Sequence, residues 1–412
     1  MQMWVYIVRR LFLLIPIIIG VMTITFALTS TLPIQQRFIA AHGTPPIRAS
    51  WEYNQYLLPG QGSCPPAPNT HQCPNPLYNT LLNQLGLDKP IPEQWAIYMG
   101  HSLTFQWGIV GNDSTAAQTI STIKGQPVTS VLSWFLPYTI ELALLALAII
   151  LVIAIPFGNL AAVNRNRPID QGARVISFSG FALAPFLLSS LVLIAVVVLL
   201  GAASGYHTIT PWCGSPGEAT FFEFYGSWPQ QSCFPGSVYP NWLTDGIISH
   251  PTGFPTVDAV IHHQYWLAVD SLVRMILPAL VIAFGSIAVL LRFVRNSMLE
   301  VMNLDFVRTA RAEGVPEKTV VKRHAGRNSL NVTITVLGLT FAFFIGGFPV
   351  IEEVFHLNGV GYMLALAVQT STGPIDFGLV FGSTLLFTYI VVFANIIVDV
   401  LYAYLDPRVR LG

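Results

Sequence analysis

The sequence predicts an all-α integral membrane protein with six transmembrane helices. Of the 412 residues, 53% are hydrophobic and only 10% are charged, whereas about 25% are charged in a soluble protein. Six strongly apolar stretches of at least 17 residues contain no Asp, Glu, Lys or Arg. Lys and Arg gather in the connections on one side of these stretches, which is the charge pattern of a multi-span membrane protein.

Each apolar stretch is long enough to cross a bilayer. A helix rises 1.5 Å per residue, so about 20 residues span a hydrocarbon core of about 30 Å. Lipid offers no partner to backbone N–H and C=O groups, so the spanning segments must be helical. Buried helices of a soluble protein are the alternative, which the few charges disfavour. The stretches are Leu11–Leu28, Leu142–Val163, Val175–Leu200, Met275–Leu291, Ser329–Ile351 and Phe377–Val398.

The basic residues predict the orientation of these spans. Fifteen of the 20 Lys and Arg lie at the N-terminus, between the second and third spans, between the fourth and fifth, and in the C-terminal tail. By the positive-inside rule, both termini are expected in the cytoplasm. The first stretch could instead be a cleaved signal peptide. Its apolar core is longer than a usual signal, and no clear small-x-small cleavage site follows, so we expect a retained span.

This orientation divides the chain into regions. We expect a first transmembrane helix over 1–31, an extracytoplasmic cap over 32–134 and a core of spans two to six over 135–412. The core carries an extracytoplasmic insertion at 201–272 and a cytoplasmic loop at 295–328.

All four cysteines fall in the two large outer loops. Cys64 and Cys73 lie in the first loop, and Cys213 and Cys233 lie in the second. Thiols confined to the oxidising side favour two disulfides, most simply one within each loop. Four free thiols, or pairing between the loops, are the alternatives. Zinc is disfavoured because no C-x-x-C spacing is present.

Several function classes are disfavoured by composition and motifs. The net charge is zero, and a nucleic-acid binder needs a basic surface. No G-x-x-x-x-G-K-[ST] motif occurs, so we do not expect this chain to bind or hydrolyse ATP. We predict no metal site and no cofactor in this chain, because no cluster of ligands has suitable spacing.

The sequence of the loop 295–328 predicts two short helices separated by a helix-terminating glycine. We expect Asp305 to be the N-cap of a short helix over Phe306–Glu313. Gly314 would be its C′ residue, and Pro316 would be the first residue of the next helix. Phe306, Ala310 and Gly314 share one face, with Val307 beside them. Such a face suits docking into a groove of another protein. The alternative is a surface helix held in lipid headgroups by its arginines.

Two segments of this loop resemble a known motif. Arg308–Val315 and Arg323–Leu330 are similar to the EAA-type loop of ABC importer permeases, most closely in the dipeptide/oligopeptide permease family. Further segments that resemble this family are Arg9–Leu11, Thr139–Leu145, Val350–Phe355, Gly359–Gly361, Asn395–Asp399 and Leu405–Arg408. Pro33–Gln36 departs from the usual Pro-Gly-Asp-Pro, and Leu330-Asn331 departs from the usual Leu-Pro.

The resemblance implies a type I ABC importer permease fold that forms half of a translocation path for di- or oligopeptides. The chain itself would be non-catalytic. Its implied partners are a second homologous permease subunit, two ATPase subunits that carry ATP and Mg, an extracytoplasmic substrate-binding protein and the lipid membrane, with no nucleic acid. The implied coupling helix, which docks on the ATPase, comprises Phe306, Val307, Ala310, Arg311, Ala312, Glu313 and Gly314.

The outer end of the fifth span carries candidate gate residues. Gly346, Gly347 and Pro349 interrupt it, so we expect a gate or hinge there; glycines that only pack helices are the alternative. Glu352 and Glu353 lie just outside this span. We expect these two carboxylates to meet a peptide amine or the binding protein.

Other transport functions remain open from the sequence. Members of the same family could import nickel, glutathione or oligosaccharides, and the motifs do not separate these from peptides. An ATP-independent secondary transporter is a different class, disfavoured because the span cores contain no ionisable residues. A membrane enzyme is disfavoured because no catalytic constellation lies at a suitable depth.

Overall fold

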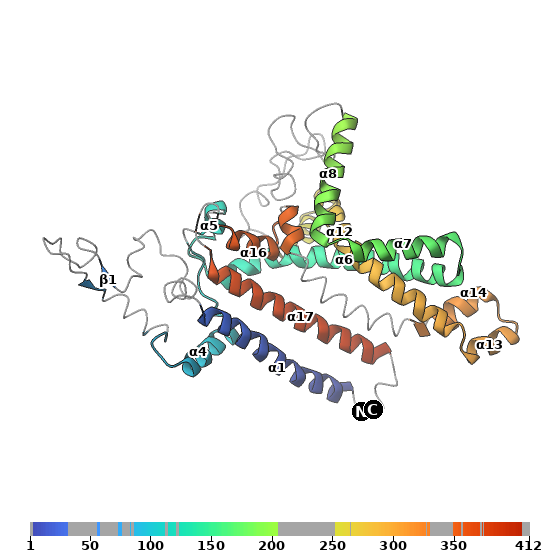
Figure 1. Cartoon of the computed structure of the whole chain (residues 1–412), viewed down its shortest axis with the longest axis horizontal. Helices are drawn as coiled ribbons and strands as arrows, with labels where there is room; N and C mark the ends of the chain where they lie inside the picture. Colours follow the sequence, from blue (N-terminus) through green and yellow to red (C-terminus); the bar gives the residue numbers. More distant parts are fainter. Residues whose placement is uncertain are drawn as a thin grey trace. The chain divides into compact units, whose positions relative to one another are not determined.

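The computed structural model is mainly helical (Figure 1). It describes residues 3–31, 56–57, 73–75, 83, 86–111, 114–120, 123–204, 252–263, 265–326, 328–329, 349–355, 357–370, 373 and 375–405. The helices are α1 (Met3–Ser30), α4 (Ile91–Leu103), α5 (Thr115–Thr119), α6 (Val128–Val163), α7 (Pro168–Ala182), α8 (Pro185–Ser204), α11 (Pro255–Ile261), α12 (Tyr265–Val301), α13 (Asp305–Ala312), α14 (Glu317–Thr319), the π-helical turn η4 (Val320–Ala325), α16 (Val360–Val368) and α17 (Phe377–Leu405).

Three helices among the described residues are long and apolar enough to cross a membrane. They are α6, the Met275–Val301 part of α12 and the Phe377–Ile397 part of α17. These helices contain the second, fourth and sixth predicted spans. Nearly all of the fifth stretch, 330–348, lies outside the described residues. The apolar helical character of the membrane part is therefore confirmed, and the total of six spans stays a prediction.

The third predicted span is interrupted. The sequence led us to expect one helix over Val175–Leu200, and that expectation is wrong, because α7 ends at Ala182 and α8 begins at Pro185 with a bend of 108° between them. Pro185 has no N–H to donate, and its ring excludes the carbonyl oxygen of the preceding turn. The residue before a proline is also driven out of the helical region. The apolar composition predicted a span but did not show the break.

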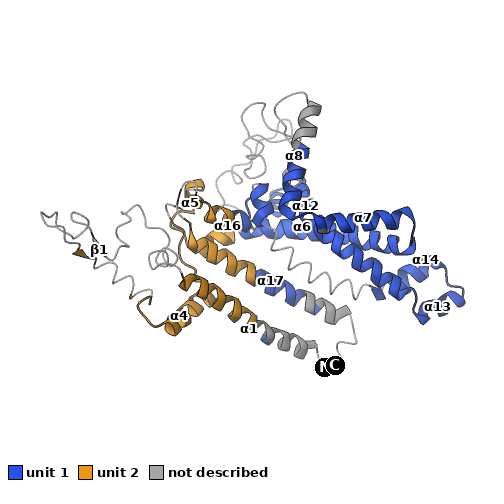
Figure 2. Cartoon of the chain, in the orientation of Figure 1, with its two compact units in different colours: residues 1–12, 136–362, 390–412 blue, residues 13–135, 363–389 orange. Residues whose placement is uncertain are grey.

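The described chain forms two compact units (Figure 2). Unit 1 comprises residues 1–12, 136–362 and 390–412, and unit 2 comprises residues 13–135 and 363–389.

In unit 2, a buried carboxylate organises the start of α17. Asp376 is 1% exposed. It accepts hydrogen bonds from the backbone N–H of Leu379, at 3.1 Å, and of Gly111, at 2.8 Å. The first bond is an N-cap that satisfies an orphan donor of α17, and the second fastens the loop before α5 to the same helix end.

Unit 2 also contains the described part of the first predicted loop. Helix α4 (Ile91–Leu103) lies within the region 32–134 that was expected to form the first outer cap. The indole N–H of Trp95 on α4 donates to the Thr23 hydroxyl on α1 at 3.1 Å. Two short antiparallel strands, β1 (Tyr56–Leu57) and β2 (Cys73–Pro74), pair earlier in the loop.

Cys73, at the start of β2, is disulfide-bonded. Cys64, Cys213 and Cys233 lie outside the described residues, so the predicted pairing within each loop stays a prediction.

Unit 1 brings α6 and α7 against α12 at two glycines. A Cβ at Gly158 on α6 would lie 2.7 Å from the Val294 side chain of α12. A Cβ at Gly180 on α7 would lie 2.2 Å from the Cβ of Ala288, also on α12. Both glycines therefore permit a helix–helix approach that a side chain would block.

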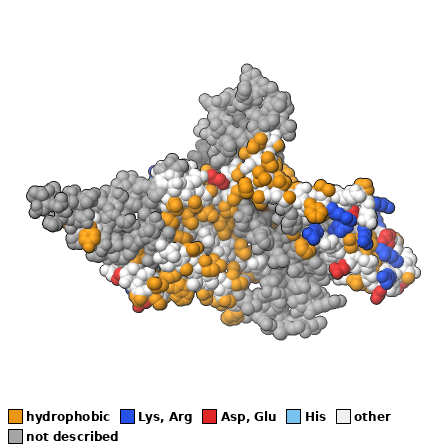
Figure 3. Space-filling view, viewed as in Figure 1, with side chains coloured by type: hydrophobic (Ala, Val, Ile, Leu, Met, Phe, Trp, Pro, Cys, Tyr) orange, Lys and Arg blue, Asp and Glu red, His pale blue; other side chains and the backbone are white. Residues whose placement is uncertain are grey.

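Among the described residues, apolar side chains cover much of the surface in view (Figure 3). Phe178 on α7 is 73% exposed and Val152 on α6 is 72% exposed. Exposed apolar area of this extent is rare on a soluble monomer and is expected where lipid or another membrane protein covers the surface.

The α7–α12 contact gives a direct test of the packing. Gly180→Ala gains about 0.5–1 kcal/mol of helix propensity. It also forces two methyl carbons together, which costs about 1–3 kcal/mol. We therefore expect a lower unfolding midpoint in detergent. Gly172→Ala, on the same helix with no heavy atom within 4 Å of its Cβ position, should raise the midpoint. Equal effects of the two substitutions would contradict the close approach.

Candidate functional site

The segment after α12 folds as a short helix followed by a tight turn. Helix α13 begins at Asp305, and its N-cap residue is Leu304 in an extended conformation. The prediction of Asp305 as N-cap is thus wrong by one residue. Asp305 instead lies in the first turn, where its negative charge is favourable beside the positive end of the helix dipole.

Gly314 ends α13 as the C′ residue that the sequence predicted. Its φ is +80°, a left-handed conformation that only glycine adopts at little cost. Gly314 N–H donates to the carbonyl of Arg311 at 3.0 Å, and Val315 N–H donates to the carbonyl of Ala310 at 3.1 Å. This pair of bonds is a Schellman motif, and it reverses the chain before α14. Pro316, expected to open the next helix, is the N-cap residue of α14.

The inner face of α13 is fixed to the rest of unit 1. Val307 is 0% exposed and Ala310 is 6% exposed. Both belong to one apolar cluster, whose other members come from the ends of α6 and α12 and from η4. These members are Ala162, Met298, Val301, Val320 and Ala325. Val307 and Ala310 therefore serve as anchors that hold α13 on its own chain, and their side chains are not available to a partner.

The outer face of α13 is exposed and charged. Phe306 is 42% exposed, and Ala312, Glu313 and Gly314 are exposed beside it. Lys and Arg side chains gather at this end of unit 1 (Figure 3). The exposed basic residues of the segment are Arg308, Arg311, Lys318, Lys322 and Arg323. The segment thus combines an exposed aromatic ring, small residues and charge, which suits recognition of another protein.

An ion pair closes the turn between α13 and α14. Arg311 donates to both carboxylate oxygens of Glu317, through Nε at 3.1 Å and through Nη2 at 2.7 Å. These bonds hold the pKa of the Glu317 carboxyl below its usual value and raise the pKa of Arg311. The contribution of Glu317 to stability is therefore present at neutral pH and is lost only as the pH falls through its lowered pKa. Both side chains are substantially exposed, so the contribution of this ion pair to stability is about 1 kcal/mol or less.

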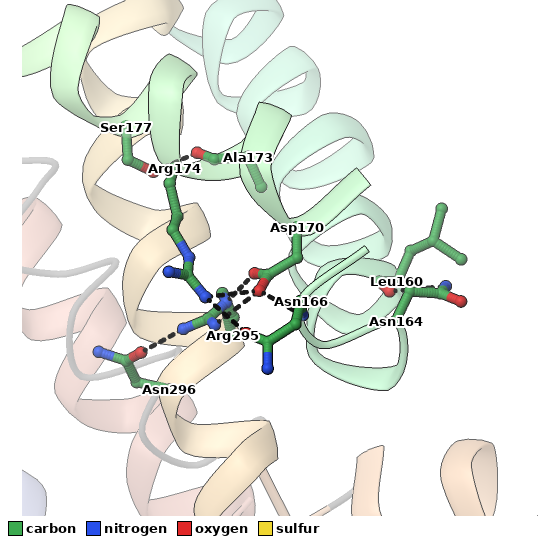
Figure 4. Close-up of polar contacts among 9 residues, drawn as sticks. All are labelled: Leu160, Asn164, Asn166, Asp170, Ala173, Arg174, Ser177, Arg295 and Asn296. Carbon is green, nitrogen blue, oxygen red and sulfur yellow. Dashed lines mark hydrogen bonds and ion pairs between the residues drawn. The ribbon is translucent and has the colours of Figure 1, made fainter. Parts of the chain in front are cut away.

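A buried carboxylate lies where α7 meets α12 (Figure 4). Asp170, in the first turn of α7, is 0% exposed. The Nε of Arg295 on α12 donates to Asp170 Oδ1, and Nη2 donates to Oδ2 at 3.1 Å. Arg174 Nη2 and the backbone N–H of Asn166 also donate to Oδ2, at 2.7 and 3.0 Å. The buried charge thus has opposite charges and hydrogen bonds around it.

The sequence led us to expect Glu352 on an exposed surface, where it would meet a peptide amine or the binding protein. The structure places it in the interior instead. It is 1% exposed. Its carboxylate accepts the backbone N–H groups of Gly361 and Tyr362 at 2.6 and 3.1 Å, and the Thr139 hydroxyl at 2.8 Å. Helix α16 begins at Val360. Glu352 therefore satisfies orphan donors at a helix N-terminus, where a negative charge is favourable.

The other predicted residues are placed only in part. Pro349 and Glu353 are partly buried, and a Cβ at Gly361 would lie 2.5 Å from the Pro349 backbone. Gly346 and Gly347 lie outside the described residues. The predicted gate thus stays a prediction.

Sequence reasoning missed the bond between Asp170 and Arg295. A local signal was present, because Pro168 followed two residues later by an acid marks a helix start. The bond to Arg295 joins residues 125 positions apart, and nothing in the local pattern specifies that pairing.

Several apolar membrane-length helices, with a short surface helix anchored at one end of unit 1, define a helical integral membrane protein. The chain belongs to the family of binding-protein-dependent transport system inner membrane components, which matches residues 154–411. This match contains α7, α12, α13 and the whole turn up to η4.

Individual relatives extend the similarity to nearly the full chain. The chain is 32% identical over 336 residues to a probable D,D-dipeptide transport system permease protein of Escherichia coli K12, covering 82% of this chain and 85% of the relative. It is 29% identical over 406 residues to the dipeptide transport system permease protein of the same strain, covering 98% of each. A putative peptide transport system permease protein of Brucella melitensis is 30% identical over 409 residues, 99% of each.

The turn after α13 gives a second prediction. Gly314→Ala places a Cβ in open space but puts alanine in a left-handed conformation, which costs about 1–2 kcal/mol. We expect faster hydrogen exchange at the Gly314 and Val315 amide positions. Gly314→Asn should raise exchange less, because asparagine adopts this conformation more readily. If alanine and asparagine leave exchange unchanged, the Schellman motif does not hold the turn.

Proposed function

We propose that this chain is the permease subunit of an ATP-driven ABC importer and forms half of a translocation path for di- or oligopeptides. The observation that carries this proposal is the similarity to a dipeptide transport permease over 98% of both chains. Membership of the binding-protein-dependent family supports the transport role. The chain acts as a membrane component and not as an enzyme, and ATP hydrolysis belongs to partner subunits.

The complete importer has partners on both sides of the membrane. A second homologous permease subunit completes the path, two ATPase subunits bind ATP and Mg, and a substrate-binding protein delivers the peptide from outside. Both termini and the segment 295–328 face the cytoplasm, supported by the concentration of Lys and Arg in these regions. This chain carries six spans of the type I importer fold, and the loops 32–134 and 201–272 form outer caps with disulfides.

Helix α13 is the coupling helix that docks on an ATPase subunit. Its exposed contact residues are Phe306, Ala312, Glu313 and Gly314, with Arg311 at the rim. Val307 and Ala310 hold the helix from beneath. Because these anchors are packed on α6, α12 and η4, a displacement of α13 moves the helix ends with it. This rigid attachment is what a coupling element needs to change the state of the path.

The gate lies at the outer end of the fifth span. Gly346, Gly347, Pro349 and Glu353 are its candidate residues. Glu352 supports this region from within through the start of α16, and it is not a peptide contact.

Removal of the exposed ring tests the docking role of α13. Phe306→Ala should weaken binding of the ATPase subunits to the detergent-purified permease by about 30-fold, the effect of losing an interface hot spot. Co-purification and titration with the ATPase measure this. Phe186→Ala on α8 is the control, because that ring is 56% exposed and lies outside the segment. Equal binding by both variants would exclude Phe306 as a contact.

Uptake by the complete importer tests the function itself. Permease, ATPases and binding protein in liposomes should accumulate a radiolabelled dipeptide only when ATP is present on the ATPase side. Uptake by this chain alone, without ATP, would show a secondary transporter instead.

A further inference from the structure

Two nitrogens of one arginine join α7 to α12 just before α13. The bonds run from Arg295 Nε and Nη2 to the two carboxylate oxygens of Asp170. The Arg295 side chain is 14% exposed, and that of Asp170 is 0% exposed. A planar fork on a carboxylate fixes relative orientation as well as distance, and burial shields it from competing water. We call this contact the Asp170–Arg295 bridge.

The bridge is connected to α13 through packed atoms. Met298 lies three residues after Arg295 on α12, and Val301 lies three residues further. Both pack in the cluster that holds Val307 and Ala310 of α13. The path from Asp170 to α13 thus consists of an ion pair, less than two turns of helix and an apolar contact.

Helix α7 is held to α12 at a second point. Gly180, ten residues after Asp170, lies in close contact with Ala288. At 1.5 Å per residue, the two points are about 15 Å apart along α7. Two separated contacts prevent α7 from pivoting about either one. Helix α7 then leads to the bend before α8, in the third predicted span.

We propose that the Asp170–Arg295 bridge is a positioning ion pair that transmits displacement of α13 to α7, and so couples ATP hydrolysis to peptide movement. This inference rests on the proposed function. Arg174 also binds Asp170, but it lies on α7 itself and is 48% exposed. It balances charge without joining two helices, and it therefore does not form part of the transmission path.

The test uses the complete importer in liposomes, with peptide uptake and ATP hydrolysis measured on the same sample. Removing one partner alone leaves a buried charge unpaired and endangers folding. The main variant is therefore the double substitution Asp170→Asn with Arg295→Gln, which is neutral and similar in volume. Arg174→Gln is the matched control, because it removes a positive charge from the same carboxylate and leaves the bridge in place.

We expect the double variant to assemble in wild-type amount but to move about fivefold less peptide per ATP hydrolysed, the lower end of usual coupling effects. Hydrogen exchange over 305–325 should become faster, because α13 loses part of its support. Arg174→Gln should keep the wild-type ratio of peptide transported to ATP hydrolysed, and it should keep the wild-type hydrogen exchange over 305–325. A wild-type ratio in the double variant, or an equal loss in Arg174→Gln, overturns the proposal.

A second variant decides the case in which the double variant does not assemble. Arg295→Lys keeps the charge but replaces the fork by a single ammonium group. A reduced ratio with normal assembly supports the bridge, and a wild-type ratio overturns it. If the wild-type importer shows no ATP-dependent uptake, the proposed function fails instead. Exchange over 305–325 in detergent then still decides whether the bridge positions α13, since wild-type exchange in Arg295→Lys overturns it.

Discussion

A buried charge must find its counter-charge inside the protein, and this constraint decides how the helices of unit 1 meet. Asp170 cannot be satisfied by α7 alone, since Arg174 is half exposed and reaches one of its oxygens. The remaining acceptor capacity is filled by Arg295 of α12. The bridge fixes the axial position and the rotation of α7 on α12. The small residues Gly180 and Ala288 allow the two backbones to come close enough for the bridge to form.

Apolar burial, and not charge pairing, places the short helix α13. A helix of eight residues is too short to be stable by itself. Its stability comes from Val307 and Ala310, which are buried against neighbouring helix ends, and from the Schellman turn at Gly314. The residues that remain exposed, including Phe306 and Glu313, are then free to recognise a partner. The buried face of the helix therefore provides its support, and the exposed face carries the residues proposed to recognise a partner.

Periodicity and composition predicted the elements but not their contacts. The apolar stretches located α6, α12 and α17, because segments in lipid must be both apolar and helical. Glycine chemistry predicted the stop at Gly314. The break at Pro185 was missed because a charge-free apolar stretch does not register the loss of a single backbone donor. Glu352 was misplaced because a carboxylate just beyond the apolar stretch suggested exposure, whereas its oxygens accept the backbone N–H groups of Gly361 and Tyr362 at the start of α16.

The sequence by itself determined the class of this protein, since the distribution of apolar and basic residues is a local property that can be read along the chain. It also determined the position and the boundaries of the helix–turn segment at 305–317 to within a residue or two. Only the tertiary structure decided which face of that helix is buried and which carboxylate pairs with which arginine. Those outcomes depend on contacts between residues more than 100 positions apart in the sequence. No local sequence pattern specifies such a contact.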